Sequence, residues 1–139
     1  RSKAKHVYAC ELNPNSIYAL QKGAELNDVC DRLTIIEGDN QITLQSLTGI
    51  ADRVHLGILP SSEDTWPLAI DCLKQIGGRI HIHMNVKEQE IQSFVDYCLK
   101  QLKQFGAQRN FHKIQLEHVE KVKWYAPHVR HIVIDVSIK

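Results

Sequence analysis

The stretch Val7-Tyr8-Ala9-Cys10-Glu11-Leu12-Asn13-Pro14 carries a short apolar run into the start of a helix. Nucleotide-binding sheets place an acidic residue at the C-terminal end of a parallel strand, where its carboxylate accepts hydrogen bonds from ribose hydroxyls. Asn13 is a typical N-cap, and Pro14 suits the first helical position because its missing N–H would have no partner there. The stretch therefore predicts a strand over 7–11, a helix after it, and Glu11 as a nucleotide-binding residue.

The glycine-rich loop that precedes such a strand by about twenty residues does not occur in this sequence. The first residue is Arg1 rather than Met. We therefore expect the chain to start inside a domain and to need an upstream part of the same protein to complete its fold.

The composition indicates one domain with a substantial core: 139 residues, of which 43% are hydrophobic, and a net charge of +1. A nucleic-acid-binding segment normally has a basic excess, so a polyanionic partner would need a local patch or protein outside this chain. The four cysteines have neither C-x-x-C nor zinc spacing, so we expect reduced thiols and a cytoplasmic location. The sequence has no signal peptide and no apolar run approaching about 18 residues, so we expect no membrane association.

Beyond residue 11 the pattern alternates strands with helices and then ends in two strands. Strands are predicted over 33–37, 51–59 and 79–86, and helices over 16–26, from residue 62 or 64 to 76, and over 88–105, with Gly106 closing the last helix. Residues 114–122 and 129–138 predict an antiparallel hairpin. We expect an α/β fold whose sheet is mostly parallel, with 7–11, 33–37, 54–59 and 80–85 running the same way, and a C-terminal antiparallel hairpin.

This order of elements resembles the Rossmann-like class I S-adenosylmethionine-dependent transferase fold without its first strand and helix. Six blocks in order look like the family of tRNA wybutosine-synthesizing protein 2, which is related to the tRNA guanine-N1 methyltransferases that act at position 37. The blocks are Ala9–Pro14, Gly38–Asn40, Ala51–Gly57, Leu59–Glu63, His81–Val86 and Tyr125–His131. The resemblance extends from about residue 7 to 136 and so covers nearly the whole chain.

The resemblance implies that residues 1–139 are the C-terminal part of a transferase catalytic domain. The implied reaction moves the 3-amino-3-carboxypropyl group of S-adenosylmethionine to the tricyclic modified guanosine 37 in the anticodon loop of phenylalanine tRNA. A sulfonium activates all three attached carbons, so the carbon presented in line with the nucleophile decides the product. The related methyltransferases have an asparagine where this chain has Ile58, which favours the aminocarboxypropyl reaction.

The same resemblance suggests which residues hold the donor. Glu11 would bind the ribose, and Asp39 with Asn40 would lie near the adenine, where Asp39 accepts from its amino group. Each has a simpler interpretation: Glu11 as a solvated carboxylate at a helix N-terminus, and Gly-Asp-Asn as ordinary turn chemistry.

Four residues are the candidate substrate cleft: Pro60, Ser61, His83 and Asn85. Pro60 would shape the loop and the Ser61 hydroxyl would bond the base or the donor's amino acid group. Ser62 could instead cap the next helix, and His81 would be a hydrogen-bonded core residue. His81 and His83 share a strand face and could chelate zinc, but no third ligand stands at motif spacing, so no metal is predicted.

Basic residues surround Trp124 and Tyr125 in the predicted hairpin: Lys121, Lys123, His128, Arg130 and His131. Such a pattern can hold phosphates and stack bases, and a solvated edge hairpin gives it equally well. Arg53 could contact RNA or simply pair with its acidic neighbour.

Three functions stay open from the sequence. The first is a tRNA aminocarboxypropyltransferase that works by positioning, because no cysteine or serine has a recognisable base around it. The second is a tRNA guanine 37 methyltransferase of the same fold. The third is a truncated, inactive fragment that binds RNA or a partner, since the isolated segment is expected to be inactive without the glycine-rich strand.

Overall fold

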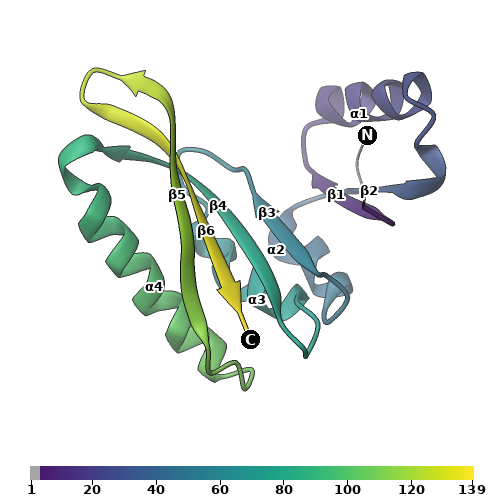
Figure 1. Ribbon diagram of the computed structural model, residues 1–139. Coiled ribbons are helices and arrows are strands. Elements are labelled where there is room, and N and C mark those ends of the chain that lie inside the picture. Colours follow the sequence, from purple (N-terminus) through teal and green to yellow (C-terminus); the bar gives the residue numbers. More distant parts are fainter. Residues whose placement is uncertain (1–3) are drawn as a thin grey trace. The chain divides into compact units, whose positions relative to one another are not determined.

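The computed structural model describes residues 4–139, and the chain divides into two compact units at residue 46 (Figure 1). The first unit contains a two-stranded sheet and the second a four-stranded sheet. We describe each unit by itself.

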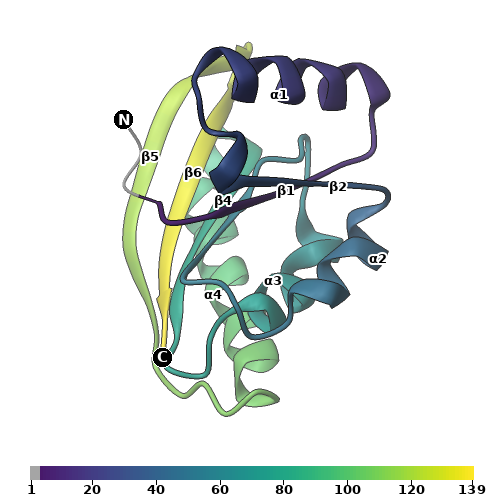
Figure 2. The same cartoon turned by 90° about the vertical axis from the view of Figure 1, so that its right-hand side faces the viewer.

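In the first unit, β1 (Val7–Glu11) and β2 (Leu33–Glu37) pair in parallel, with Glu11 opposite Glu37. The connecting helix α1 (Pro14–Leu26) lies on one side of this pair (Figure 2). Its start is as predicted: the Asn13 side chain accepts from the Asn15 N–H at 2.9 Å, and Pro14 is the first helical residue. A short helix, α2 (Asn40–Thr43), follows β2.

The second unit is a mixed sheet in the order β3-β4-β6-β5. Its strands are β3 (Arg53–Leu56), β4 (Gly78–Lys87), β5 (Ile114–Ala126) and β6 (Val129–Ile138). β3 is parallel to β4, whereas β4–β6 and β6–β5 are antiparallel. Helices α3 (Trp66–Cys72) and α4 (Ile91–Ala107) contribute their apolar residues to the same core as this sheet (Figure 1).

The two central strands, β4 and β6, alternate between a buried and a half-buried face along most of their length. Ile80, Ile82, Ile132 and Ile134 are all 0% exposed and pack with the apolar stripe of α4. The opposite face of β4 carries polar side chains, among them His81, His83 and Asn85. Since successive side chains of a strand point to opposite faces, β4 contributes apolar side chains to the core and polar side chains to the other face of the sheet.

The parallel pairing within β1–β2 and within β3–β4 and the C-terminal antiparallel hairpin are confirmed. The strands predicted to be parallel pair as β1–β2 and β3–β4, in two separate sheets. The third strand is also shorter than predicted, because β3 ends at Leu56 instead of residue 59. The residues after it enter a loop with a cis peptide bond between Leu59 and Pro60, and proline cannot donate to a ladder.

Gly106 does not close the last helix, contrary to the sequence prediction. It lies within α4 and is buried against the start of β5. A Cβ atom at this position would lie 2.5 Å from Cδ1 of Ile114. The glycine therefore allows a close helix–strand contact, and the helix runs on to Ala107.

All four cysteines, Cys10, Cys30, Cys72 and Cys98, are free thiols. Burial raises the pKa of the Cys98 thiol to about 12. No helix within residues 4–139 has the length and apolar character that crossing a membrane requires.

Candidate active site

Glu11 stands at the C-terminal end of β1 with one carboxylate oxygen fixed and the other available. Its Oε1 accepts the backbone N–H groups of Leu12 and Asn13, both at 2.9 Å. Within residues 4–139 its Oε2 has no hydrogen-bond partner. The helix start therefore orients the side chain and leaves an acceptor free for a ligand hydroxyl.

Asp39 and Asn40 follow β2 at the same end of the two-stranded sheet as Glu11. The N–H of Gly38 donates to the carbonyl of Glu11 at 3.0 Å, which ties the two strand ends together. Asp39 Oδ1 accepts from the N–H of Gln41 at 2.8 Å, as an N-cap of α2. The structure thus brings together all three residues predicted to bind the donor, with Asp39 also making the turn that its sequence pattern favours.

The Pro60 loop lies against the end of β4. The backbone N–H of Asn85 faces the carbonyl oxygen of Pro60 at 3.4 Å. Ser61 is exposed, and its Oγ accepts from the N–H of Glu63 at 3.2 Å in a local turn. The loop that carries Pro60 and Ser61 therefore lies next to Asn85, 24 residues further along the chain than Ser61, near the C-terminal end of β4.

Ser62 is a structural residue, although it does not cap a helix. It is 3% exposed, and its Oγ accepts from the indole N–H of Trp66 at 3.2 Å. Its side chain makes no cap hydrogen bond. The preceding serine in the loop, Ser61, is the one that is exposed.

His83 is the centre of a histidine cluster on the half-buried face. Its Nδ1 is 2.9 Å from Nε2 of His131, and its ring centroid is 4.4 Å from that of His55. Burial, followed by the neighbouring His55, His131 and His81, lowers the pKa of His83. Burial, followed by His81, likewise lowers the pKa of His55. At least one of the hydrogen-bonded pair must be neutral to accept, so the cluster favours uncharged imidazoles.

The side chain of Asn85 is buried and unsatisfied. Neither its amide nitrogen nor its amide oxygen has a hydrogen-bond partner within the described part of the chain. A buried amide without partners costs free energy, and native proteins leave few of them. The Asn85 amide therefore has two N–H donors and an acceptor oxygen without partners, near the C-terminal end of β4 and beside the Pro60 loop.

His81 is a hydrogen-bonded residue, as predicted. Its Nδ1 lies 2.6 Å from Oδ1 of Asp135 on β6, which fixes the ring. Over residues 4–139, no group of three or more His, Cys, Asp or Glu side chains is arranged to hold a metal ion.

Sequence reasoning missed His55 as a neighbour of His83, and Glu88 as the partner of the hairpin's basic residues. His55 lies within the predicted third strand, and its ring contact with His83 depends on the β3–β4 pairing, in which His55 stands opposite His81. Glu88 begins the predicted helix 88–105, and its carboxylate accepts from Lys121 at 2.7 Å and from Arg130 at 2.8 Å. Only the strand registers could have revealed either contact.

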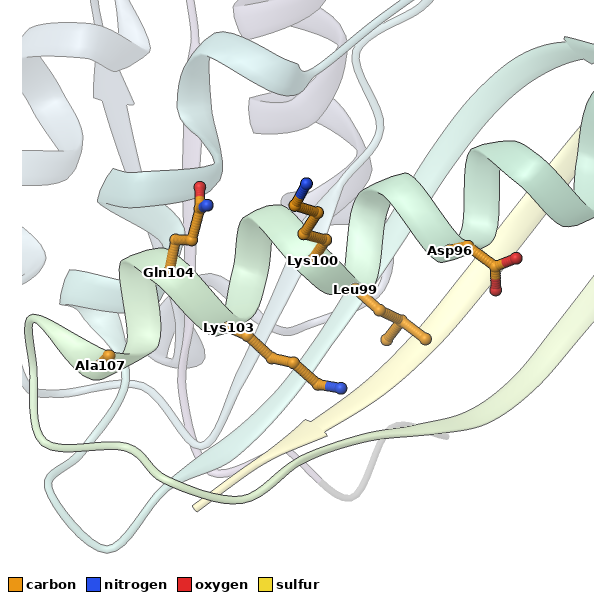
Figure 3. Close-up of a pocket in the computed structure, with 6 residues that line it drawn as sticks. All are labelled: Asp96, Leu99, Lys100, Lys103, Gln104 and Ala107. Carbon is orange, nitrogen blue, oxygen red and sulfur yellow. The ribbon is translucent and has the colours of Figure 1, made fainter.

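A pocket on the surface of α4 contains none of these residues. It is lined by Asp96, Leu99, Lys100, Lys103, Gln104 and Ala107. Figure 3 shows Lys100 and Gln104 pointing to one side of the helix and Leu99 and Lys103 to the other. All six belong to one helix, so this is an open surface.

Comparison with known proteins gives matches over the whole chain. The family described as the TRM5/TYW2 methyltransferase domain matches residues 1–114. The chain is 48% identical to tRNA wybutosine-synthesizing protein 2/3/4 of Arabidopsis thaliana over 140 residues, covering all of this chain and 14% of that protein. It is 35% identical to the tRNA wybutosine-synthesizing protein 2 homolog of Danio rerio, covering 99% of this chain and 41% of that protein.

A solved structure agrees with these matches. The crystal structure of M. jannaschii TYW2 in complex with AdoMet superposes with a TM-score of 0.82 at 30% identity, covering 99% of this chain and 59% of that one. This chain thus spans less than half the length of the curated relatives above. The family match over residues 1–114, the identity to the relatives and the shared fold lead to one conclusion: the chain belongs to the TRM5/TYW2 methyltransferase domain family.

Proposed function

We propose that the protein transfers the 3-amino-3-carboxypropyl group of S-adenosylmethionine to the tricyclic modified guanosine 37 of phenylalanine tRNA. The observation that carries the proposal is the unsatisfied amide of Asn85, which offers a base or the donor's amino acid group a buried polar partner beside the Pro60 loop. The reaction class follows the relatives, several of which are named for wybutosine synthesis.

S-Adenosylmethionine is the proposed donor, and the first unit has the groups that would hold it. The free Oε2 of Glu11 suits a ribose hydroxyl, and Asp39 and Asn40 stand at the same strand ends. The relative from M. jannaschii was crystallised with AdoMet, which supports the same donor.

The second unit has the groups that would position the base. Ser61 and Asn85 supply hydroxyl and amide groups near the C-terminal end of β4, and His83, whose pKa is lowered by burial and by the neighbouring imidazoles, lies on the same strand. The Ser61 hydroxyl makes only a long hydrogen bond to Glu63, at 3.4 Å, and Asn85 is not a nucleophile. These residues therefore favour catalysis by positioning over covalent catalysis. A tRNA substrate also fits a cytoplasmic location.

Completing the fold would require a further part of the same protein. Within the described residues β1 pairs only with β2, and β3 only with β4, so each has an edge without partners. Unpaired strand edges expose backbone donors and acceptors and promote association. We expect residues 1–139 alone to bind S-adenosylmethionine negligibly by calorimetry, and a monodisperse segment with micromolar affinity would contradict this.

The deciding experiment compares the transfer of two isotopic labels from S-adenosylmethionine to tRNA. The full-length protein is incubated with phenylalanine tRNA that carries the tricyclic guanosine, and with S-adenosylmethionine labelled either in the carboxyl carbon or in the methyl group. The proposal predicts that only the carboxyl label enters the tRNA. Transfer of only the methyl label would make the protein a tRNA methyltransferase, and transfer of neither label would leave the proposal without its reaction.

A further inference from the structure

The tip of the β5–β6 hairpin exposes two aromatic rings. Trp124 is 53% exposed and Tyr125 is 63% exposed, although the other tryptophan of the chain, Trp66, is 1% exposed. A solvated indole is unusual because aromatic rings gain most from burial. The exposure of Trp124 therefore calls for an explanation beyond stability.

One face of Trp124 is already occupied by a fixed cation. The guanidinium carbon of Arg130 lies 3.6 Å from the centroid of the indole ring. Arg130 is held in turn by Glu88, which also accepts from Lys121. The Arg130 guanidinium orders the indole ring and covers one of its faces. The exposed surface of the Trp124 ring is therefore available as a flat platform for another planar group.

The backbone at this point is irregular. The β5–β6 register shifts between Lys121 and Lys123, and again between Trp124 and Ala126. Such bulges redirect side chains and are frequent next to functional sites. The two shifts flank Trp124, so the side chain is set by a local distortion and not by the regular pleat.

The hairpin tip lies at the same end of the four-stranded sheet as the candidate substrate residues. Asn85 stands opposite His131 in the β4–β6 ladder, and Lys87 opposite Val129. The N–H of Glu88 donates to the carbonyl of His128 at 2.9 Å, which fixes the turn to the end of β4. Trp124 shares a strand face with Arg130 and Val86, whereas Asn85 lies on the other face, so a polynucleotide held at Asn85 would pass around the hairpin to reach the ring.

The charge near the platform suits a polyanion. The Lys123 ammonium, next to Trp124 in sequence, makes no ion pair within residues 4–139. Lys121 and Arg130, by contrast, are both neutralised by Glu88. Lys123 pairs with His131 and Trp124 with Arg130 in the ladder, so the free cation and the exposed ring lie on opposite faces of the edge strand β5. A single-stranded polyanion that crosses this edge would meet a cation for its phosphate on one face and a ring for its base on the other.

We propose that Trp124 is a stacking platform for an unpaired nucleobase of the RNA substrate, with Arg130 behind the ring and Lys123 on a phosphate at the other face of β5. This inference rests on the proposed tRNA substrate and adds to it a contact outside the transfer residues. A single-stranded loop, whose bases can unstack, is the RNA form that such a ring recognises.

The test uses the full-length protein labelled with 5-fluorotryptophan, in which the resonance of Trp124 is assigned by its absence from the Trp124→Phe variant. Addition of phenylalanine tRNA should shift this resonance. Trp124→Ala should weaken tRNA affinity roughly 5- to 100-fold, the range for loss of one stacked base. Trp124→Phe should restore most of the affinity, because a phenyl ring still stacks.

Ile76→Ala is the matched control, since Ile76 is 82% exposed and precedes β4 at the opposite end of that strand. It should leave tRNA affinity unchanged. If the wild-type protein transfers the carboxyl label but Trp124→Ala binds tRNA as tightly as wild type, the inference that Trp124 stacks on an RNA base is wrong, and the proposed function stands. If the Trp124 resonance responds to a protein partner but not to tRNA, the platform serves protein contacts and the inference is overturned.

Discussion

The four-stranded sheet and the β1–α1–β2 unit share a strand–helix alternation, but they bury very different cores. In residues 47–139, α3, α4 and the sheet enclose Trp66, Ile70, Ile82 and Leu102, each at most 1% exposed. In residues 4–46, Ile17 and Ala24 are the buried apolar side chains, and Tyr8 on β1 is 47% exposed. The second unit has a complete core of its own, whereas the first has a thin one.

The two units also carry different polar chemistry. The first ends its parallel strands with carboxylates, Glu11 and Asp39. The second ends its strands with a neutral amide, Asn85, near imidazoles whose pKa is lowered by burial, as for His83. Hydroxyl groups of a nucleoside suit the first set, and a flat base suits the second. We therefore infer that donor binding and base positioning can be disturbed separately.

Core truncation should show the largest effect and should differ between the units. Ile82→Ala removes a side chain that is 0% exposed, so it should lower the free energy of unfolding by about 2–5 kcal/mol. Ile17→Ala in the thin core should leave the main urea transition nearly unchanged. Equal losses for both variants would show that the two units unfold as one.

Removal of the strand-end carboxylate should act on donor binding. Glu11→Ala in the full-length protein deletes a free acceptor at the end of β1, and it should weaken S-adenosylmethionine binding by roughly 1–3 kcal/mol. Calorimetry measures this directly. Glu37→Ala, which alters the neighbouring exposed strand end, is the control and should bind as wild type does. Unchanged affinity for Glu11→Ala would remove this residue from the site.

The histidine cluster should give a smaller, pH-dependent effect. Burial and the neighbouring imidazoles lower the pKa of His83 in the folded protein, so the unfolded chain takes up the proton first. Stability is then complete above the ordinary histidine pKa of about 6.5 and decreases as the pH falls through it. His83→Gln should flatten this decrease in urea midpoints measured from about pH 7.5 to about pH 5.5. Identical slopes for variant and wild type would rule out His83 as the cause.

Much of this architecture can be predicted from sequence because it depends on local rules. The Asn13–Pro14 helix start, the strand ending at Glu11 and the hairpin after residue 114 follow from capping, periodicity and turn chemistry. Three features depend instead on long-range packing. These are the division into two sheets, the early end of β3 and the passage of α4 through Gly106.

The candidate site likewise contains residues whose positions can be predicted from sequence and contacts that cannot be. The carboxylates at the ends of β1 and β2 follow from the place of parallel strands in a sheet, as the sequence pattern predicts. The ring contact between His55 and His83 and the ion pair between Glu88 and Arg130 join residues more than 25 positions apart. They depend on strand register, which a single sequence determines only weakly.

The most direct test of separate donor and base sites is the replacement of Asn85 by leucine in the full-length protein. Because the wild-type amide is buried without partners, an apolar side chain of similar size should leave stability unchanged or raise it. S-Adenosylmethionine affinity should stay at the wild-type value, while transfer of the carboxyl label to tRNA falls at least about tenfold, equivalent to about 1.4 kcal/mol of transition-state stabilisation. Met84→Leu, on the buried face of β4, should retain transfer. Wild-type transfer by Asn85→Leu would contradict the account.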